Sequence, residues 1–379
     1  MIKSKTFAFS ALSLALSITP AFADETKGFL ENIRKHTTLA STAIANGDLN
    51  PYAVFVAPAS SGKIMKDDVL IDNFNDKSNL QGTGATIVKY SPSTKEVTLF
   101  AQIPKNLPNC PGGVGLTAAM VMLKSGWVIV GSTPSTDGTT STLGKGCLIV
   151  LDNQGNVANT ITGPNINGPW GNMVVIDNGK TATLFVSNAG FDIPAPDTTD
   201  AATGEPVLVS KATVLRINFT IGEGKAPTIV SQTVVASGIN ARADKDAFLV
   251  GPTGLALAPD SKTLYASDGV NNRVIAIDNA TTRKDSAGTG REIVSGGLLK
   301  RPLAMVTAPN GNLLITNALN GQAVEVDPIA KKILYARWFD NDAAQSPPGK
   351  GDLFGLAMTP DGKGVYYVED DVNALMEAR

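Results

Sequence analysis

Asn and Asp residues follow several short apolar stretches, and they are the side chains in this sequence best suited to chemistry. The six candidates are Asn73, Asn172, Asn188, Asp268, Asn317 and Asp370. Carboxylate and amide oxygens suit calcium, which takes roughly six to eight oxygen ligands. The same residue types also cap turns through hydrogen bonds from side chain to backbone. The pattern therefore allows a calcium site, with turn capping as the structural alternative.

Aromatic and cationic residues accompany these oxygens in the same turns. Tyr52 and Trp170 would give a small ligand an apolar floor, and Arg301 would bind an anionic group. Packing between neighbouring repeats is the alternative role for the two aromatic side chains. We therefore take these three residues as candidate ligand-binding residues.

The sequence contains one histidine, His36, which narrows the possible catalytic chemistry. A Ser-His-Asp arrangement, a multi-histidine zinc site and a histidine-pair lyase all need at least one histidine in the active site. His36 precedes every repeat described below, so we expect no catalytic role for it. The catalytic residues, and whether the protein is an enzyme at all, stay open.

Two cysteines, Cys110 and Cys147, are present. In an oxidising compartment an even pair favours a disulfide. A metal or redox pair is the alternative, but the spacing is not C-x-x-C and no histidine accompanies it. We predict a structural disulfide between them.

The first 23 residues have the pattern of a signal peptide. Lys3 and Lys5 precede an apolar run over residues 7–18, and the small-x-small triplet Ala21-Phe22-Ala23 follows. This predicts a periplasmic or secreted protein beginning near Asp24, with no membrane span. Removing two lysines changes 32 basic against 34 acidic residues to 30 against 34, a net charge of −4. This charge argues against a nucleic-acid partner.

A repeated pattern organises the rest of the chain: a small-residue apolar stretch, a turn, a stretch ending in Asn or Asp, and a further alternating stretch. The clearest copies start at residues 252, 302 and 354, with spacings of 50 and 52 residues. Weaker copies start at residues 51, 116 and 169. A single small sheet cannot bury both faces, whereas sheets stacked radially bury them against neighbours. Six repeats therefore predict an all-β, six-bladed β-propeller with four-stranded blades.

The chain ends predict how this ring closes. The last repeat ends after its third strand, near residues 374–377, and residues 37–43 have the pattern of a displaced fourth strand. We expect this N-terminal strand to complete the last blade, because closure leaves no open sheet edge. Residues 24–379 then form one domain, with an inserted loop at about residues 192–211.

The stretch Tyr265–Asp278, with Asn271-Asn272-Arg273 in its turn, resembles an NHL repeat. The whole mature chain resembles NHL-type and SMP-30/gluconolactonase-like six-bladed propellers. That resemblance implies calcium- or zinc-dependent lactonases, lyases or binding propellers. The lactonase-like members carry a Glu ligand at the start of the first blade, where this sequence reads Asn50-Pro51-Tyr52.

Two functional hypotheses follow from these observations. The first is an exported binding module. It would bind a small molecule or an envelope protein on the face of the propeller where the central channel opens. The alternative is a calcium-dependent, lactonase-like hydrolase or lyase. We expect a monomer in either case.

Overall fold

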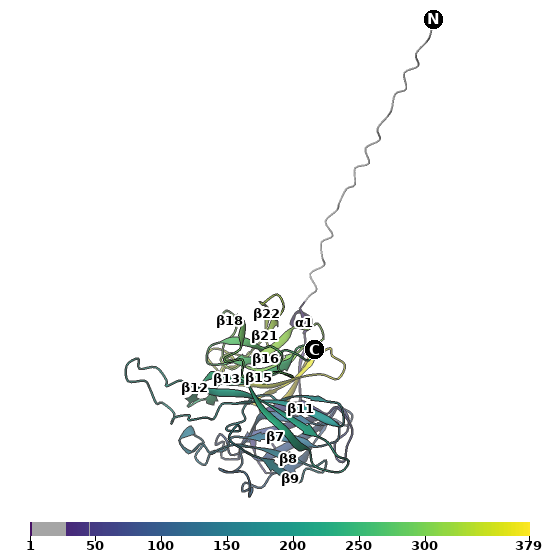
Figure 1. The fold of residues 1–379 in the computed structure, drawn as a ribbon, viewed down its shortest axis with the longest axis vertical. Coiled ribbons are helices and arrows are strands. Elements are labelled where there is room, and N and C mark those ends of the chain that lie inside the picture. The colour runs from purple at the N-terminus through teal and green to yellow at the C-terminus, as the bar shows by residue number, and fades with distance from the viewer. Residues whose placement is uncertain (2–27, 45) are drawn as a thin grey trace.

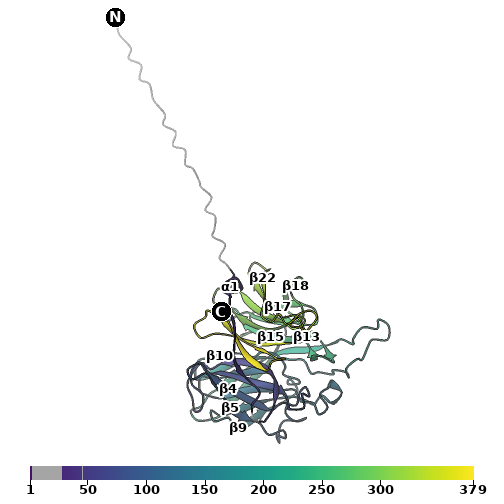
Figure 2. The same cartoon turned by 180° about the vertical axis from the view of Figure 1, so that it is seen from behind.

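The computed structural model describes residue 1, residues 28–44 and residues 46–379 of the chain. The predicted signal peptide, residues 1–23, lies outside the described residues apart from Met1. Within the described ranges the strands form six antiparallel sheets arranged as a β-propeller (Figures 1 and 2). The predicted fold class is confirmed.

The first three blades follow one another along the chain from the innermost strand outwards. Blade 1 consists of β2 (Leu49–Val56), β3 (Val69–Asn75), β4 (Thr86–Ser91) and β5 (Glu96–Gln102). Blade 2 consists of β6 (Leu116–Met122), β7 (Val128–Ser132), β8 (Cys147–Leu151) and β9 (Val157–Ile161). Blade 3 consists of β10 (Val174–Asp177), β11 (Thr181–Asn188), β12 (Val209–Thr220) and β13 (Thr228–Asp244), with the short strand β14 (Phe248–Val250) added to its edge.

The last three blades repeat the same order. Blade 4 consists of β15 (Pro252–Leu257), β16 (Leu264–Asp268), β17 (Arg273–Ile277) and β18 (Arg291–Ser295). Blade 5 consists of β19 (Pro302–Thr307), β20 (Leu313–Asn317), β21 (Gln322–Asp327) and β22 (Lys332–Trp338). Blade 6 consists of β23 (Leu353–Met358), β24 (Val365–Glu369), β25 (Ala374–Ala378) and the N-terminal strand β1 (His36–Ser41).

Strand β1 closes the ring, as the sequence predicted. It pairs antiparallel with β25, so that His36 lies opposite Ala378 and Ser41 lies opposite Ala374. An N-terminal and a C-terminal strand therefore share one sheet. Strand β1 supplies the fourth strand of blade 6 and covers the edge that β25 would otherwise expose.

The pairing of the innermost strand with the second strand contains a register shift in most blades. At several of these shifts a side chain of the second strand accepts a backbone N–H of the innermost strand. Ser267 Oγ accepts the Gly254 N–H at 2.6 Å, and Thr316 Oγ1 accepts the Ala304 N–H at 3.1 Å. In blade 1 the carboxylate of Asp72 takes this role, accepting the Ala53 N–H at 2.8 Å. The bulges bend the strands at the crowded axis while their amides stay hydrogen-bonded.

A disulfide and a short helix add contacts between separate parts of the chain. A disulfide joins Cys110, in the segment after β5, to Cys147 at the start of β8, which confirms the predicted pairing. The short helix α1 (Phe29–Asn32) packs against β21 and β22 of blade 5. The 3-10 helix η1 (Thr140–Thr142) lies in the loop between β7 and β8.

Residues 189–208, between β11 and β12, contain most of the insertion predicted at about 192–211, whose last residues, 209–211, belong to β12. Their outer part projects from the body of the molecule beside β12 (Figure 1).

The helices of the described residues are too short or too polar for any of them to span a membrane.

Candidate functional site

An aromatic cluster is formed by side chains of β2, β3, β14 and β23 and of the segment before β10. It consists of Tyr52, Phe74, Trp170, Phe248 and Phe354. The ring centroids of Tyr52 and Phe354 are 4.4 Å apart, and those of Trp170 and Phe248 are 5.9 Å apart. Strands β2 and β23 contribute residues to a cavity on each side of this cluster. The cluster therefore divides the channel into two cavities with different linings.

The first cavity, the mouth cavity, has a volume of about 500 Å³. Tyr52, Phe74 and Phe354 of the aromatic cluster form its floor. Its polar walls come from the strand ends and loops of several blades: Asn50, Asn75, Asn79, Gln81, Asp246, Arg301, Gln345, Ser346, Lys350, Asp352 and Asp370. It thus combines a stacking surface with many hydrogen-bonding groups.

Five buried oxygens in the wall of the mouth cavity have no hydrogen-bond partner among the residues that the structure describes. They are Asn50 Oδ1, Asn75 Oδ1, Gln81 Oε1, Gln345 Oε1 and Asp352 Oδ2. The side chains of Asn50, Asn75 and Asp352 are only 6%, 3% and 7% exposed. Buried polar groups are normally hydrogen-bonded, so a cluster of exceptions requires an explanation.

Buried carboxyl groups line the same cavity. Burial raises the pKa of Asp370 to about 7, and the charge of Asp371 adds to the effect. Burial also raises the pKa of Asp352 well above its ordinary value, with further contributions from Asp371 and Asp340. Groups with such pKa values in a concave site are typical of binding and catalytic centres.

Arg301 lies at the edge of the mouth cavity, where it shares one carboxylate with a second arginine. Its guanidinium donates to Asp244 Oδ2 at 2.9 Å, and Arg242 lies 2.9 Å from the same oxygen. Tyr52 and Arg301, two of the three predicted ligand-binding residues, therefore line the same cavity. Trp170 lies fully buried inside the aromatic cluster and lines neither cavity.

The six residues predicted as candidate calcium ligands do not line a single cavity. Asp370 lines the mouth cavity, and Asn172 lines the opposite cavity. The side chains of the other four, Asn73, Asn188, Asp268 and Asn317, are fully buried. They form hydrogen bonds with Thr42, Asn167, Arg273 and Lys300, respectively. These four contacts are of the kind by which Asn and Asp side chains brace turns.

A different group of carboxylates lies beside the mouth cavity. Oxygens of Asp340, Asp352 and Asp371 all lie within 4.8 Å of one another. Sequence reasoning missed all three of these carboxylates, together with the unpaired amides of the cavity wall. These residues do not occupy the strand ends at which the repeat pattern places Asn and Asp. The only local hint of a polar residue at this site was Asp352 itself, which follows Gly351 just before the last repeat begins.

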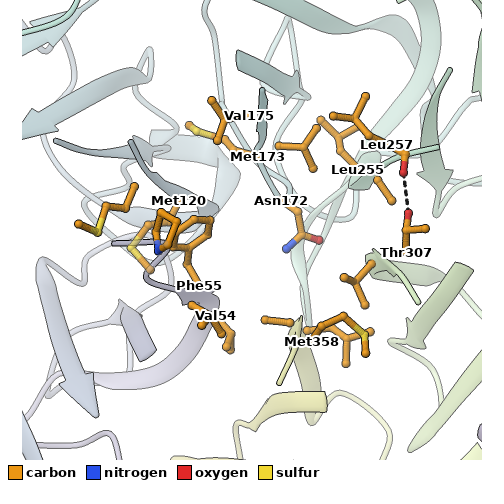
Figure 3. A pocket seen from close by; sticks show the side chains of 18 of the residues that line it. Val54, Phe55, Met120, Asn172, Met173, Val175, Leu255, Leu257, Thr307 and Met358 are labelled. Atoms are coloured by element: carbon orange, nitrogen blue, oxygen red, sulfur yellow. Dashed lines mark hydrogen bonds between the residues drawn. The ribbon is translucent and has the colours of Figure 1, made fainter. Parts of the chain in front are cut away.

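The second cavity, at the opposite end of the channel, has a volume of about 560 Å³. Figure 3 shows its apolar lining, to which Met120, Met173 and Met358 contribute from three blades. Asn172 projects into this lining, and its Oδ1 accepts the Met305 N–H at 3.2 Å. This cavity offers far fewer polar groups than the mouth cavity.

Comparison with known proteins adds to the description of the fold. No known family model matches the chain. A curated relative, the chloroplastic protein SUPPRESSOR OF QUENCHING 1 of Arabidopsis thaliana, is 25% identical over 147 residues. The match covers 33% of this chain and only 13% of the relative's length.

Solved structures match most of the chain at low sequence identity. A gluconolactonase from Xanthomonas campestris has a TM-score of 0.54 at 12% identity, covering 91% of this chain and 89% of its own. The calcium-binding protein regucalcin from Agrobacterium tumefaciens has a TM-score of 0.51 at 12% identity, covering 91% and 93%. Virginiamycin B lyase from Staphylococcus aureus has a TM-score of 0.51 at 12% identity, covering 91% and 99%. The chain therefore shares the β-propeller fold of these structures.

Proposed function

We propose that this protein is an exported β-propeller that binds a small polar molecule in the mouth cavity. The observation that carries the proposal is the group of five buried, unpaired oxygens above an aromatic floor. Leaving one buried polar group unpaired costs about 1–3 kcal/mol. A ligand that bonds to several of these oxygens would remove that cost, which gives the cavity a physical reason to be occupied.

The shape of the cavity supports the same function. A volume of about 500 Å³ lies in the range of roughly 300–1,000 Å³ that is typical of small-molecule sites. Tyr52 and Phe354, packed at 4.4 Å, give the floor a rigid apolar surface. The floor positions a ligand, while the wall provides specificity.

Export is part of the proposal. The disulfide between Cys110 and Cys147 is compatible with an oxidising compartment. The signal-peptide pattern of residues 1–23 points the same way. Periplasmic or secreted location is tested by fractionating cells that express the full chain.

The experiment for binding is a thermal-shift screen of a small-molecule library against the protein and an Ala247→Phe variant. Ala247 lines the mouth cavity and is partly exposed, so a larger side chain fills the cavity without entering the core. We expect ligands that raise the unfolding midpoint of the original protein and leave that of Ala247→Phe unchanged.

The control for this screen is Ala201→Phe, which adds the same ring to the exposed loop before β12. The same ligands should raise the unfolding midpoint of this variant as much as that of the original protein. If the stabilising ligands act equally on Ala247→Phe, or if none is found, the mouth cavity is not the functional site.

A calcium-dependent, lactonase-like hydrolase or lyase is the second candidate. The cluster of Asp340, Asp352 and Asp371 favours a cation, because carboxylates close together are stabilised by one. Calorimetric unfolding with calcium and with a chelator tests it, since a cation that binds only the folded state raises the midpoint. A midpoint that calcium leaves unchanged, or raises equally in Asp371→Asn, removes this candidate.

A further inference from the structure

We infer that the ligand of the mouth cavity is an organic cation with N–H donors, that is, an aliphatic amine in its ammonium form. The inference rests on the proposed function, because it names the chemical class of ligand for the same cavity. It follows from three properties of the wall and floor: unpaired acceptors, negative charge and aromatic faces.

The first property is that the unpaired groups are all acceptors. In residues 28–44 and 46–379, twelve buried side-chain atoms lack a hydrogen-bond partner, and the five that line the mouth cavity are all oxygens. For two of them, other bonds support the assignment of the amide oxygen. Asn75 Nδ2 donates to Asn79 Oδ1 at 2.7 Å, and Gln81 Nε2 donates to the carbonyl of Asp246 at 3.1 Å. A ligand that satisfies this wall must therefore bring donors.

The second property is the balance of charge. The buried wall contains the carboxyl groups of Asp352 and Asp370, and the guanidinium of Arg301 is engaged with Asp244. Lys350, the other cationic residue of the lining, is exposed. A buried carboxylate favours a cation as its partner, because each charge compensates the desolvation of the other.

The third property is the aromatic floor. The faces of aromatic rings attract cations within about 6 Å of the ring centroid, and this attraction strengthens when the site is desolvated. Tyr52, Phe74 and Phe354 supply three such rings next to the carboxyl groups. A neutral polyol would use the acceptors and the floor, but it would leave the negative charge without a partner.

The experiment is isothermal titration of the mature protein with 1,4-diaminobutane and, as a neutral analogue of the same length, 1,4-butanediol. Ethanolamine and phenethylamine extend the amine set, and glucose and calcium chloride test a polyol and a metal ion. We expect at least one amine to bind and the diol and glucose to give no heat of binding. Asp352→Asn and Asp370→Asn should each weaken amine binding about tenfold or more, because each removes a charge from the wall.

The control variant is Asp342→Asn, which removes an exposed carboxylate from the same loop as Gln345 and should leave amine affinity unchanged. Circular dichroism confirms that each variant is folded. Glucose or the diol binding as tightly as the amines would overturn the inference and leave the proposed function intact. Calcium binding without amine binding, or no amine binding at all, would also overturn it, while the Ala247→Phe screen decides the proposed function separately.

Discussion

Two buried carboxylates show how differently this propeller uses acidic residues. Glu325, on β21, is fully buried, and its carboxylate accepts four hydrogen bonds. The donors are the backbone amides of Phe29 and Leu30 in α1, at 2.8 and 2.9 Å, and the side-chain amides of Asn310 and Asn312, at 3.1 and 2.7 Å. Glu325 therefore fastens the N-terminal segment to blade 5.

Asp352, at the wall of the mouth cavity, is nearly as buried, but its Oδ2 has no hydrogen-bond partner within the described ranges. Its nearest charged neighbours are the carboxylates of Asp340 and Asp371. A carboxylate with all its partners is a structural group, whereas one held among like charges in a cavity is available to a ligand. The difference predicts opposite effects on stability when each acid is replaced.

The largest expected effect comes from removing the N-terminal segment that Glu325 and β25 hold. A chain that begins at Ile44 lacks α1 and β1, which opens the edge of blade 6 and leaves Glu325 without its two backbone donors. We expect the thermal midpoint to fall by roughly 10 °C or more, since about 1 kcal/mol corresponds to about 2–4 °C in a large domain.

A chain beginning at Gly28 retains both elements and serves as the matched control. Calorimetry of the two chains gives the comparison. Equal midpoints would show that β1 is dispensable for ring closure.

The next effect concerns Glu325 itself. Glu325→Gln keeps the size of the side chain but removes its charge and places an amide N–H₂ among four donors. We expect a loss of about 2–4 kcal/mol in the free energy of unfolding, because buried donors are left unpaired. Urea unfolding measures it, with Glu96→Gln on the exposed edge of β5 as the control. A loss no greater than that of Glu96→Gln would mean that α1 docks without this carboxylate.

The sequence predicted the fold well because the information is repeated along the chain. Equivalent starts about 50 residues apart define the blades, and the missing strand of the last repeat identifies β1. The disulfide followed from the even number of cysteines together with the predicted export of the chain. Each of these features depends on pattern or parity, which a single sequence shows directly.

The candidate site was harder to predict because its residues are not repeated. Asp268 ends its strand as predicted, yet Arg273 Nε donates to its Oδ2 at 2.8 Å, and nothing in the local sequence distinguishes that role from metal binding. Asn50, Gln345 and Asp352 meet only when β2 of blade 1 packs beside the segment that joins blades 5 and 6. Their convergence depends on tertiary packing, which a pattern of spacing cannot express.

A third prediction concerns Asp72, which is buried like Glu325 but only half paired. Its Oδ1 accepts the Ala53 N–H, while Oδ2 has no partner in the part of the chain that the structure describes. Burial raises the pKa of Asp72 to about 8. The unfolded chain releases this proton near pH 4, so between about pH 4 and pH 8 the folded protein binds more protons. Stability therefore falls as the pH rises through this window.

Asp72→Asn should flatten this dependence and change stability by about 1–3 kcal/mol at pH 8, because the amide is neutral throughout. Urea unfolding at pH 5 and pH 8 gives the difference for each protein. The raised pKa values of Asp370 and Glu369, both about 7, act in the same direction, so the relevant quantity is the change in slope between the variant and the original. Identical slopes would show that Asp72 is ionised in the folded protein.

The smallest effect, and the one of opposite sign, is expected at Asp352. Asp352→Asn replaces a carboxyl group crowded by Asp340 and Asp371 with a neutral amide, and Asp352 Oδ2 accepts no hydrogen bond from a described residue that the change would break. The new amide N–H₂ instead offers a donor to the neighbouring carboxylates. We therefore expect stability to stay constant or rise by up to about 1 kcal/mol in the presence of a chelator, which excludes metal binding. Urea unfolding at pH 7 measures it beside Glu325→Gln, and a loss as large as at Glu325 would mean that Asp352 is a structural group whose partners form part of the fold.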